Sequence, residues 1–412
     1  MYLKIIRESI QTDGVVHATH KIISHAVNLL LEPWYRTRPL KKNTILFSSF
    51  PDYNDNARVL YDYMISKGLK QKYELIWVAN NKIGYSMMKN RGMECVPRHA
   101  ILPHNGRHRF YYYGRRAEWY FHTHGHPFFD GGYPDQHLIS LWHGGMSFKK
   151  GKGITTVEGQ IKKKDEYILT SGSGEITEQF ALAFHHCPRE TLLPLGSPRN
   201  DLLFKEKAIP EFDSIAEKKI LWMPTFRQSA SEYISSASLD SETGFPILYT
   251  PEMVNELNEF LEEKKIHLFI KLHPLQLRDK IMDVDLSNIH LMTNDDLENM
   301  NVQLYEIINH FDALLTDYSS VSFDYLYLDR PIGYTLDDLE EYRKTRGFPM
   351  ENPLDYMPGH HIYTYDDFTQ FIVDIAEEND AYTIERERVR KEVGMPEGGK
   401  CCQQLLEFLE II

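Results

Sequence analysis

Two histidines of this 412-residue sequence stand directly after predicted strands, where a side chain can reach a ligand. His143 follows the apolar run HLISLW and precedes a Gly-Gly pair that begins at Gly144, and glycine lets a backbone approach a ligand closely. His273 follows the run HLFIKL. Because imidazole titrates near neutral pH, His143 could act as a general base, and His273 could stabilise phosphoryl charge. The alternative for each is an ordinary loop histidine.

The segment LLTDYSSVSFD has the pattern of a strand that ends at Thr316 and turns into a helix. Asp317, Ser319 and Ser320 are typical residues for such a turn and helix cap. Free N–H groups at a helix start, together with two hydroxyls, suit a phosphate or pyrophosphate, although the dipole itself contributes only about 0.3–2 kcal/mol. The segment therefore predicts either a phosphate site or a plain helix cap.

Basic side chains follow several predicted turns and could contact an anionic ligand. Arg199 lies in SPRND and Arg227 in PTFR, and a guanidinium can bind two phosphate oxygens at once. Lys149 belongs to a lysine-rich stretch soon after His143. Each has an alternative, because either arginine could pair with a carboxylate such as Asp201, and the lysines could form a solvated loop.

His122, His124 and His126 form an HxHxH run, and alternate residues of a strand share one face. A metal site there is conceivable, but no cluster of carboxylates or cysteines accompanies the run, so we expect no bound metal. The sequence also lacks a P-loop, a GxGxxG after a strand, a GxSxG elbow and an HExxH. These absences disfavour dehydrogenases, P-loop kinases, serine esterases and zincin proteases.

The elements that must position these residues alternate between short apolar strands and helix-length segments, which predicts parallel sheets built from βαβ units. A first cycle ends at the turn-rich joint 195–201, and a second follows it. We therefore predict an α/β fold with two Rossmann-like domains, 43–200 and 201–412, facing each other across a cleft after a helical segment 1–42. The predicted strands are 43–49, 73–79, 118–121, 137–142, 167–170, 219–223, 267–272, 313–316 and 332–334, and the predicted helices are 57–67, 251–264, one after Ser319, and 399–412 packed back on the body.

Composition and charge limit the classes of partner. Apolar residues make up 42% and charged residues 25%, as in globular proteins, and the net charge of −13 argues against a nucleic-acid partner. Residues 1–42 carry seven Lys or Arg against three Asp or Glu and include a Trp-Tyr pair, so this segment either lies on an anionic membrane surface or packs on the protein body. Four cysteines without zinc spacing indicate a reduced, cytosolic compartment, and we find no signal peptide and no membrane span.

Taken together, these motifs resemble those of the CDP-glycerol glycerophosphotransferase family, enzymes that prime or polymerise teichoic acids and related capsule polymers. No single segment is specific, but their order over nearly the whole chain is. The matching segments are FSSF at 47–50 with Asp55-Asn56, WHG at 142–144, GSPRND at 196–201, MPTFR at 223–227, KLHP at 271–274, TDYSS at 316–320, FDY at 323–325, DRP at 329–331, and DLEEYR at 338–343 with Gly347-Phe348.

The resemblance implies a GT-B-like fold, CDP-glycerol as donor, no cofactor, and peripheral attachment to the cytoplasmic face of the cell membrane. It also implies that the C-terminal half binds the nucleotide diphosphate. By position, His143 and His273 match the family's two functional histidines, and Ser319 and Ser320 match the pair that binds pyrophosphate. The further residues predicted to bind substrate are Thr316, Asp317, Arg199, Arg227, Gly144 and Lys149.

The resemblance predicts that an acceptor hydroxyl attacks the phosphorus next to glycerol, that CMP leaves, and that His143 removes the proton. Two departures concern the expected acceptor side: GMSFK at 145–149 stands where the family usually has TPLK, and His122-Thr123-His124 replaces a stretch that commonly contains Asn. Three alternatives therefore stay open, namely a CDP-ribitol or other CDP-polyol donor, a GT-B glycosyltransferase that uses a nucleotide sugar, and a non-catalytic CDP-polyol-binding scaffold. Primase and polymerase activity both stay open as well.

Overall fold

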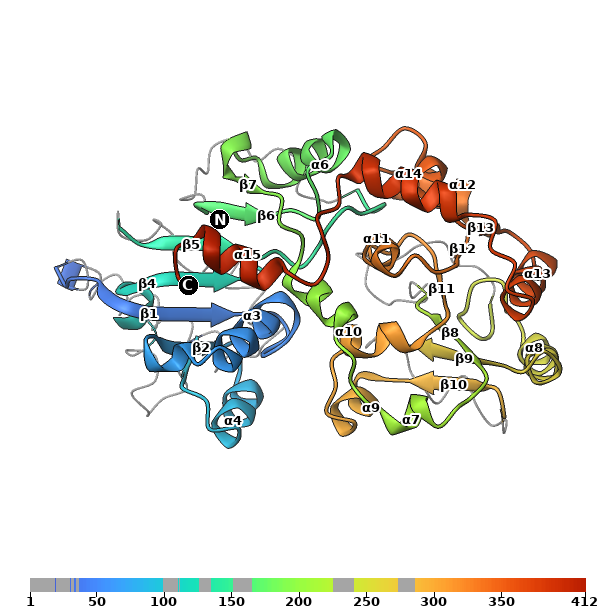
Figure 1. Ribbon diagram of the computed structural model, residues 1–412, viewed down its shortest axis with the longest axis horizontal. Coiled ribbons are helices and arrows are strands. Elements are labelled where there is room, and N and C mark those ends of the chain that lie inside the picture. Colours follow the sequence, from blue (N-terminus) through green and yellow to red (C-terminus); the bar gives the residue numbers. More distant parts are fainter. Residues whose placement is uncertain are drawn as a thin grey trace.

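The computed structural model describes two α/β domains, each built on a parallel sheet (Figure 1). This architecture confirms the predicted fold class. The helical segment predicted over residues 1–42 lies almost entirely outside the described residues. The described residues are 37–98, 112–125, 135–150, 165–224, 241–272 and 286–412, with the single positions Thr19, Leu30, Pro33, Trp34 and Phe110.

The first sheet has seven strands in the order β3-β2-β1-β4-β5-β6-β7, and every pair is parallel. Strand β1 lies between β2 and β4, so that Ile45 has Leu75 on one side and Trp119 on the other. Apolar runs such as LIWVA suit strands that are covered on both faces. The strands are β1 (Lys41–Ser48), β2 (Glu74–Ala79), β3 (Cys95–Pro97), β4 (Ala117–His122), β5 (His137–Ser140), β6 (Tyr167–Leu169) and β7 (Leu192–Leu193).

The second sheet has six parallel strands in the order β10-β9-β8-β11-β12-β13. Strand β11 is buried along its whole length, and its Leu314 pairs with Leu221 and Ile332. Because the strands are parallel, their carboxyl ends meet at one edge, where ligands of such sheets bind. The strands are β8 (Lys218–Trp222), β9 (Ile266–Lys271), β10 (Ile289–Met292), β11 (Ala313–Thr316), β12 (Ile332–Thr335) and β13 (His360–Ile362).

Local capping groups explain where several helices begin. The Thr250 side chain accepts from the Met253 amide with Pro251 at the first helical position, and Thr364 forms a reciprocal capping box with Asp367. The helices are α3 (Asp55–Ser66), α4 (Lys82–Asn90), α6 (Glu175–His185), α7 (Pro210–Asp213), α8 (Pro251–Lys264), α9 (Asn294–Asn299), α10 (Leu304–Ile307), α11 (Val321–Tyr325), α12 (Leu339–Thr345), α13 (Tyr365–Ala376), α14 (Thr383–Val393) and α15 (Cys401–Phe408), and the joint between the sheets holds the 3-10 helix η4 (Pro198–Phe204).

The last helix, α15, returns from the second domain and packs against the first sheet (Figure 1). Leu405 and Leu406 are buried in the same core as Ile45. The carboxylate of Asp201 accepts hydrogen bonds from the first amides of α15, at 2.8 Å from Cys401 N and 2.9 Å from Cys402 N. The expected packing of 399–412 on the body is therefore found, although these residues contribute to the first core and not to that of the second sheet.

Candidate active site

The loop that follows β5 leaves the first sheet and packs against the second domain. Its Met146 and Phe148 are buried in one core cluster with Phe323 and Tyr334 of the second domain. The ring of Phe148 stacks on that of Phe323 with 4.9 Å between centroids. Because these apolar side chains anchor the loop just beyond His143, that histidine is held at the junction of the two domains.

His143 is exposed, and one hydrogen bond orients its ring. Its Nδ1 lies 3.0 Å from the carbonyl oxygen of Thr123. A carbonyl can only accept, so Nδ1 carries the proton and Nε2 of the neutral ring keeps a lone pair. Within the described residues, Nε2 has no hydrogen-bond partner. A general base needs this tautomer, although the role itself stays a prediction.

The backbone before His143 is held in an uncommon conformation by Asn56 of α3. Trp142 has a φ of 48°, and the left-handed region costs a residue other than glycine about 1–3 kcal/mol. The buried Asn56 amide donates to the carbonyl oxygens of Leu141 at 3.0 Å and of Trp142 at 2.8 Å. Its Oδ1 accepts from the Arg199 amide at 2.9 Å. One side chain therefore fixes the turn that orients His143.

The two glycines of the loop are closely packed by Trp142 and Ser171. A Cβ on Gly144 would lie 3.0 Å from Cε2 of the Trp142 indole, and a Cβ on Gly145 would lie 3.3 Å from Cβ of Ser171. The Ser171 hydroxyl also accepts from the Met146 amide at 2.9 Å. These contacts differ from the ligand approach suggested by the sequence, and contact between Gly144 and a substrate stays a prediction.

Arg199 lies in η4, and its guanidinium bonds to both domains. Nη1 donates to Oδ1 of Asp55 at 3.1 Å and to the carbonyl oxygen of His143 at 2.7 Å, whereas Nη2 donates to Oδ2 of Asp324 at 2.9 Å. Its carboxylate partners are thus Asp55 and Asp324, and Asp201 instead caps α15. These contacts make Arg199 a positioning residue, and its contact with a substrate stays a prediction.

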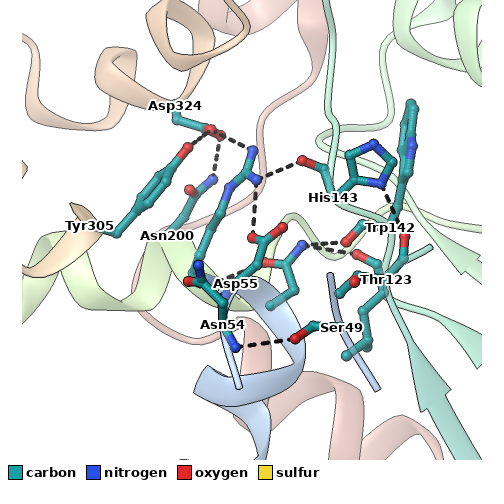
Figure 2. A network of polar contacts seen from close by, with 12 residues as sticks. Ser49, Asn54, Asp55, Thr123, Trp142, His143, Asn200, Tyr305 and Asp324 are labelled. Atoms are coloured by element: carbon teal, nitrogen blue, oxygen red, sulfur yellow. Dashed lines mark hydrogen bonds and ion pairs between the residues drawn. The ribbon is translucent and has the colours of Figure 1, made fainter. Parts of the chain in front are cut away.

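Asp324 of α11 collects further bonds from the elements around Arg199 (Figure 2). The Asn200 amide donates to its Oδ1 at 2.9 Å, and the Tyr305 hydroxyl donates to its Oδ2. Burial raises the pKa of Tyr305 well above its usual range, so this hydroxyl stays protonated and remains a donor. A buried carboxylate needs such complete pairing. Asp324 therefore ties the second domain to η4.

The turn after β11 has the predicted ends, because β11 stops at Thr316 and α11 begins directly after Ser320. Thr316 and Asp317 are fully buried, and the Thr316 hydroxyl donates to the Met223 carbonyl at 3.1 Å. Ser319 and Ser320 are partly exposed, and neither hydroxyl has a hydrogen-bond partner in the described part of the chain. The two serines are therefore available to a ligand, whereas substrate contact by Thr316 and Asp317 stays a prediction.

Lys149 brings positive charge to this turn from the other domain. It is exposed near the end of the loop after β5. Desolvation of its ammonium group lowers the pKa of Lys149, whereas the nearby charge of Asp317 raises it and that of Arg346 lowers it further. An anion that reached Ser319 and Ser320 would therefore meet at least one cation of the first domain.

Three residues singled out from the sequence lie outside the described ranges: His273, Arg227 and His126. The strand that precedes His273 is described to its end. Its last residue, Lys271, is buried and donates to the Leu272 carbonyl at 3.0 Å and to Oδ1 of Asn294 at 2.7 Å. Burial lowers the pKa of Lys271 to about 8. The chain before His273 is thus tied to α9.

His122 is the last residue of β4, so His124 does not lie on that strand. His122 is buried, its Nε2 lies 2.7 Å from Oδ1 of Asp165, and its Nδ1 accepts from the Gly125 amide at 3.0 Å. His124 is exposed. Over the described ranges, no three His, Cys, Asp or Glu side chains are grouped to hold a metal ion. The absence of a bound metal stays an expectation.

Sequence reasoning gave no chemical role to four residues that build this site: Asp55, Asn56, Tyr305 and Asp324. Asp55, Asn56 and Asp324 lie in motif segments that carry the family resemblance, and this position was the signal that could have found them. Tyr305 lies in α10, outside all those segments. Its contact with Asp324 depends on the folded chain and leaves no pattern in the sequence.

Two parallel-sheet domains have an oriented imidazole at their junction and a turn whose two serine hydroxyls lack partners among the described residues, and this arrangement is a GT-B-like fold. The chain belongs to the CDP-Glycerol:Poly(glycerophosphate) glycerophosphotransferase family, whose sequence profile matches residues 31–410. The resemblance found from the motifs is thereby confirmed, and the chain is an enzyme of that transferase family.

Known proteins similar to this chain come from teichoic acid synthesis. It is 27% identical over 296 residues to the teichoic acid ribitol-phosphate primase of Bacillus spizizenii, covering 66% of this chain and 68% of that protein. It is 27% identical over 386 residues to the teichoic acid poly(glycerol phosphate) polymerase of Staphylococcus epidermidis, covering 85% of this chain but only 49% of the polymerase. The chain thus spans about half the length of that polymerase.

A solved structure of the wall teichoic acid polymerase TagF has the same fold. Its TM-score to this chain is 0.70 at 20% identity, and the match covers 95% of this chain and 97% of that one. Every helix in the described part of the chain is too short or too polar to span a membrane.

Proposed function

We propose that the chain transfers glycerol phosphate from CDP-glycerol to a hydroxyl of a teichoic-acid-like or capsular polymer and releases CMP. The observation that carries the proposal is His143, whose Nε2 keeps a lone pair at the domain junction. Family membership supports CDP-glycerol as the donor. The names of the similar primase and polymerase support a polymer of the teichoic acid class as the acceptor.

In the proposed reaction, the acceptor oxygen bonds to the phosphorus next to glycerol, and the bond from that phosphorus to the oxygen shared with CMP breaks. Nε2 of His143 takes the hydroxyl proton, a contribution of about 10²–10⁴-fold for general base catalysis. Negative charge grows on the departing CMP, where the hydroxyls of Ser319 and Ser320 and the ammonium group of Lys149 stabilise it.

The family resemblance adds His273 and Arg227 to the groups that stabilise the leaving phosphate. It also implies that the reaction needs no cofactor. We therefore expect that a chelator leaves the rate of CMP release unchanged, and loss of activity that added divalent metal restores would contradict this expectation.

The donor polyol has one specific rival, because a ribitol-phosphate primase is among the similar proteins. The same residues would serve CDP-ribitol, since the groups named above bind the diphosphate and not the polyol. Direct competition between CDP-glycerol and CDP-ribitol decides between them. A higher kcat/KM for CDP-ribitol would reverse the proposed donor.

We place the reaction on the cytoplasmic face of the cell membrane, with Trp34 and residues 37–42 against anionic lipid. Trp34 is 40% exposed, and the guanidinium of Arg38 lies 4.3 Å from the centroid of its ring. Aromatic and basic residues together favour the surface of an anionic bilayer. Sedimentation with phosphatidylglycerol vesicles should recover the protein, and the charge reversals Arg38→Glu and Lys42→Glu should weaken that binding. Equal recovery with phosphatidylcholine vesicles would contradict the proposal.

The deciding assay combines the protein with CDP-glycerol and a primed polymer acceptor, and measures both CMP and the linkage formed. We expect a phosphodiester product, and His143→Ala should lower CMP release by about 10²–10⁴-fold. His137→Ala is the matched control, since His137 is part-exposed at the start of β5 and pairs with Glu166. Near-normal CMP release by His143→Ala would remove the base from the mechanism. A glycosidic product would favour a glycosyltransferase, and binding of CDP-glycerol without CMP release would favour a scaffold.

A further inference from the structure

A second imidazole lies directly against the ring of His143. The rings of His124 and His143 are parallel to within 9°, with only 3.8 Å between their centroids. Thr123 holds both rings, because its carbonyl oxygen accepts from Nδ1 of His143 and its hydroxyl lies 2.8 Å from Nδ1 of His124. The two side chains thus form one imidazole pair with a common support.

The Thr123 contacts leave both Nε2 atoms open. His124 and His143 are exposed, and neither Nε2 has a hydrogen-bond partner within the described ranges. Burial, followed by the neighbouring His143 and His122, lowers the pKa of His124 to about 4, so its ring is neutral at pH 7. When the Thr123 hydroxyl donates to Nδ1 of His124, Nε2 of His124 carries the proton. The pair then presents one acceptor, on His143, beside one donor, on His124.

The pair stands on the acceptor side of the site. His124 follows β4 and is thus carried by the first domain, whereas the hydroxyls available to the diphosphate belong to the second. Phe50, which follows β1, meets His124 edge to face at 5.9 Å and is 63% exposed. An exposed aromatic ring beside two imidazoles suits the carbon chain of a polyol.

We propose that His124 is an acceptor-binding residue whose Nε2–H donates to the oxygen next to the attacking hydroxyl. The chemical class that the pair would take is a vicinal diol at the end of a polyol phosphate, with one oxygen on each imidazole. This inference rests on the proposed function, because His143 must be the base. It gives His124 a role that is separate from proton transfer.

The test measures binding in the absence of any nucleotide donor. The probes are sn-glycerol 3-phosphate, which has the vicinal diol, and 3-hydroxypropyl phosphate, which lacks the middle hydroxyl. Imidazole NMR signals of the full chain follow each titration. Wild type should bind the diol about 5-fold more tightly, as one net hydrogen bond of about 1 kcal/mol requires. His124→Phe keeps a ring against His143 and should bind both probes equally, at the weaker affinity.

Two further variants make this outcome specific. His124→Asn keeps an N–H donor and should restore part of the preference for the diol. His137→Phe is the matched control, because His137 is also stacked on an aromatic ring, Trp119, at 4.1 Å and 19°, and it should keep the full preference. In turnover, His124→Phe should raise KM for the polymer acceptor and leave KM for the nucleotide donor unchanged.

The inference is overturned if His124→Phe keeps the wild-type preference between the two probes, or if wild type shows none. Thermal unfolding of His124→Phe like that of wild type excludes a folding defect as the cause of a change. These results are independent of the proposed function, which depends on CMP release and on the linkage of the product. If the wild-type protein releases CMP but binds the two probes with equal affinity, only the proposed role of His124 is contradicted.

Discussion

At the scale of single residues, the site depends on groups that do no chemistry themselves. Asn56 and Thr123 hold backbone and ring atoms around His143, and both are buried. The sequence predicted His143 directly after a strand over 137–142, whereas β5 ends at Ser140 and His143 lies in the loop that follows it. The sequence could not show which residues hold His143 in place, since Asn56 belongs to α3 and Thr123 directly follows β4.

Replacing Asn56 with Ala removes the three bonds that fix the turn before His143. We expect the free energy of unfolding to fall by about 1–3 kcal/mol, because buried backbone groups lose their partner. We also expect kcat to fall more than KM for the donor rises, since His143, the proposed base, is no longer aligned. Urea unfolding and CMP release measure the two effects. Asn56→Asp keeps the acceptor for the Arg199 amide, and wild-type kcat in both variants would contradict the alignment role.

A histidine pair in the second domain predicts sensitivity to acid. Burial lowers the pKa of His290 to about 4, and His267, whose Nδ1 lies 2.9 Å from Nε2 of His290, adds to the effect. The unfolded value is about 6.5, so between these values the unfolded chain binds more protons than the folded one. The contribution of neutral His290 to the free energy of unfolding is therefore complete above about pH 6.5, and it is lost as the pH falls towards 4. His290→Phe should flatten this part of the stability curve in denaturant titrations, and an unchanged slope would contradict the assignment.

At the scale of elements, the sequence predicted long buried runs best. Strand β11 and helix α8 have the predicted bounds, because one is a continuous apolar run and the other begins at a Thr-Pro cap. The edge strands β3, β7, β10 and β13 were missed, since two to four residues carry little periodicity and a neighbouring strand decides their pairing. The joint at 195–201 was predicted as a turn and contains the start of the buried helix η4, because its polar residues find partners more than 100 positions away.

The carboxylate of Asp201 should stabilise helix α15, which lies about 200 positions further along the chain. Asp201 of η4 accepts from the first two amides of α15, so Asp201→Ala should lower the free energy of unfolding by about 0.5–2 kcal/mol, as loss of a helix cap does. Asp201→Asn keeps one acceptor oxygen and should lose less. Hydrogen exchange should rise in α15 and in β1, which share a core. Faster exchange confined to the second sheet would refute the assignment.

At the scale of the whole molecule, the two domains meet through polar and apolar contacts at different places. Arg199 joins Asp55 to Asp324, and Phe148 packs on Phe323. On another side of the junction, the end of α14 docks on the start of α6, where the Gly174 amide donates to the Val393 carbonyl at 2.9 Å. A Cβ on Gly174 would lie 1.9 Å from the Glu392 oxygen, which explains the glycine. The sequence could not predict these contacts between the domains, because each of them joins residues that are far apart in the chain.

Replacing Arg199 with Met should show how strongly the domains are coupled. The change leaves the carboxylates of Asp55 and Asp324 without their cation, and breaking a buried pair costs about 3–5 kcal/mol. The double variant Arg199→Met with Asp324→Asn should recover part of the loss, because one stranded charge is removed. Urea unfolding followed by tryptophan fluorescence measures both. Strictly additive losses would mean that the two residues act independently.

The return of α15 to the first sheet sets an order for assembly on the ribosome. The second domain has all of its strands once residue 362 has emerged, but the core around Ile45 waits for Leu405, Leu406 and Ile411. Until this last helix has been made, the half of the molecule that carries His143 therefore lacks part of its apolar core.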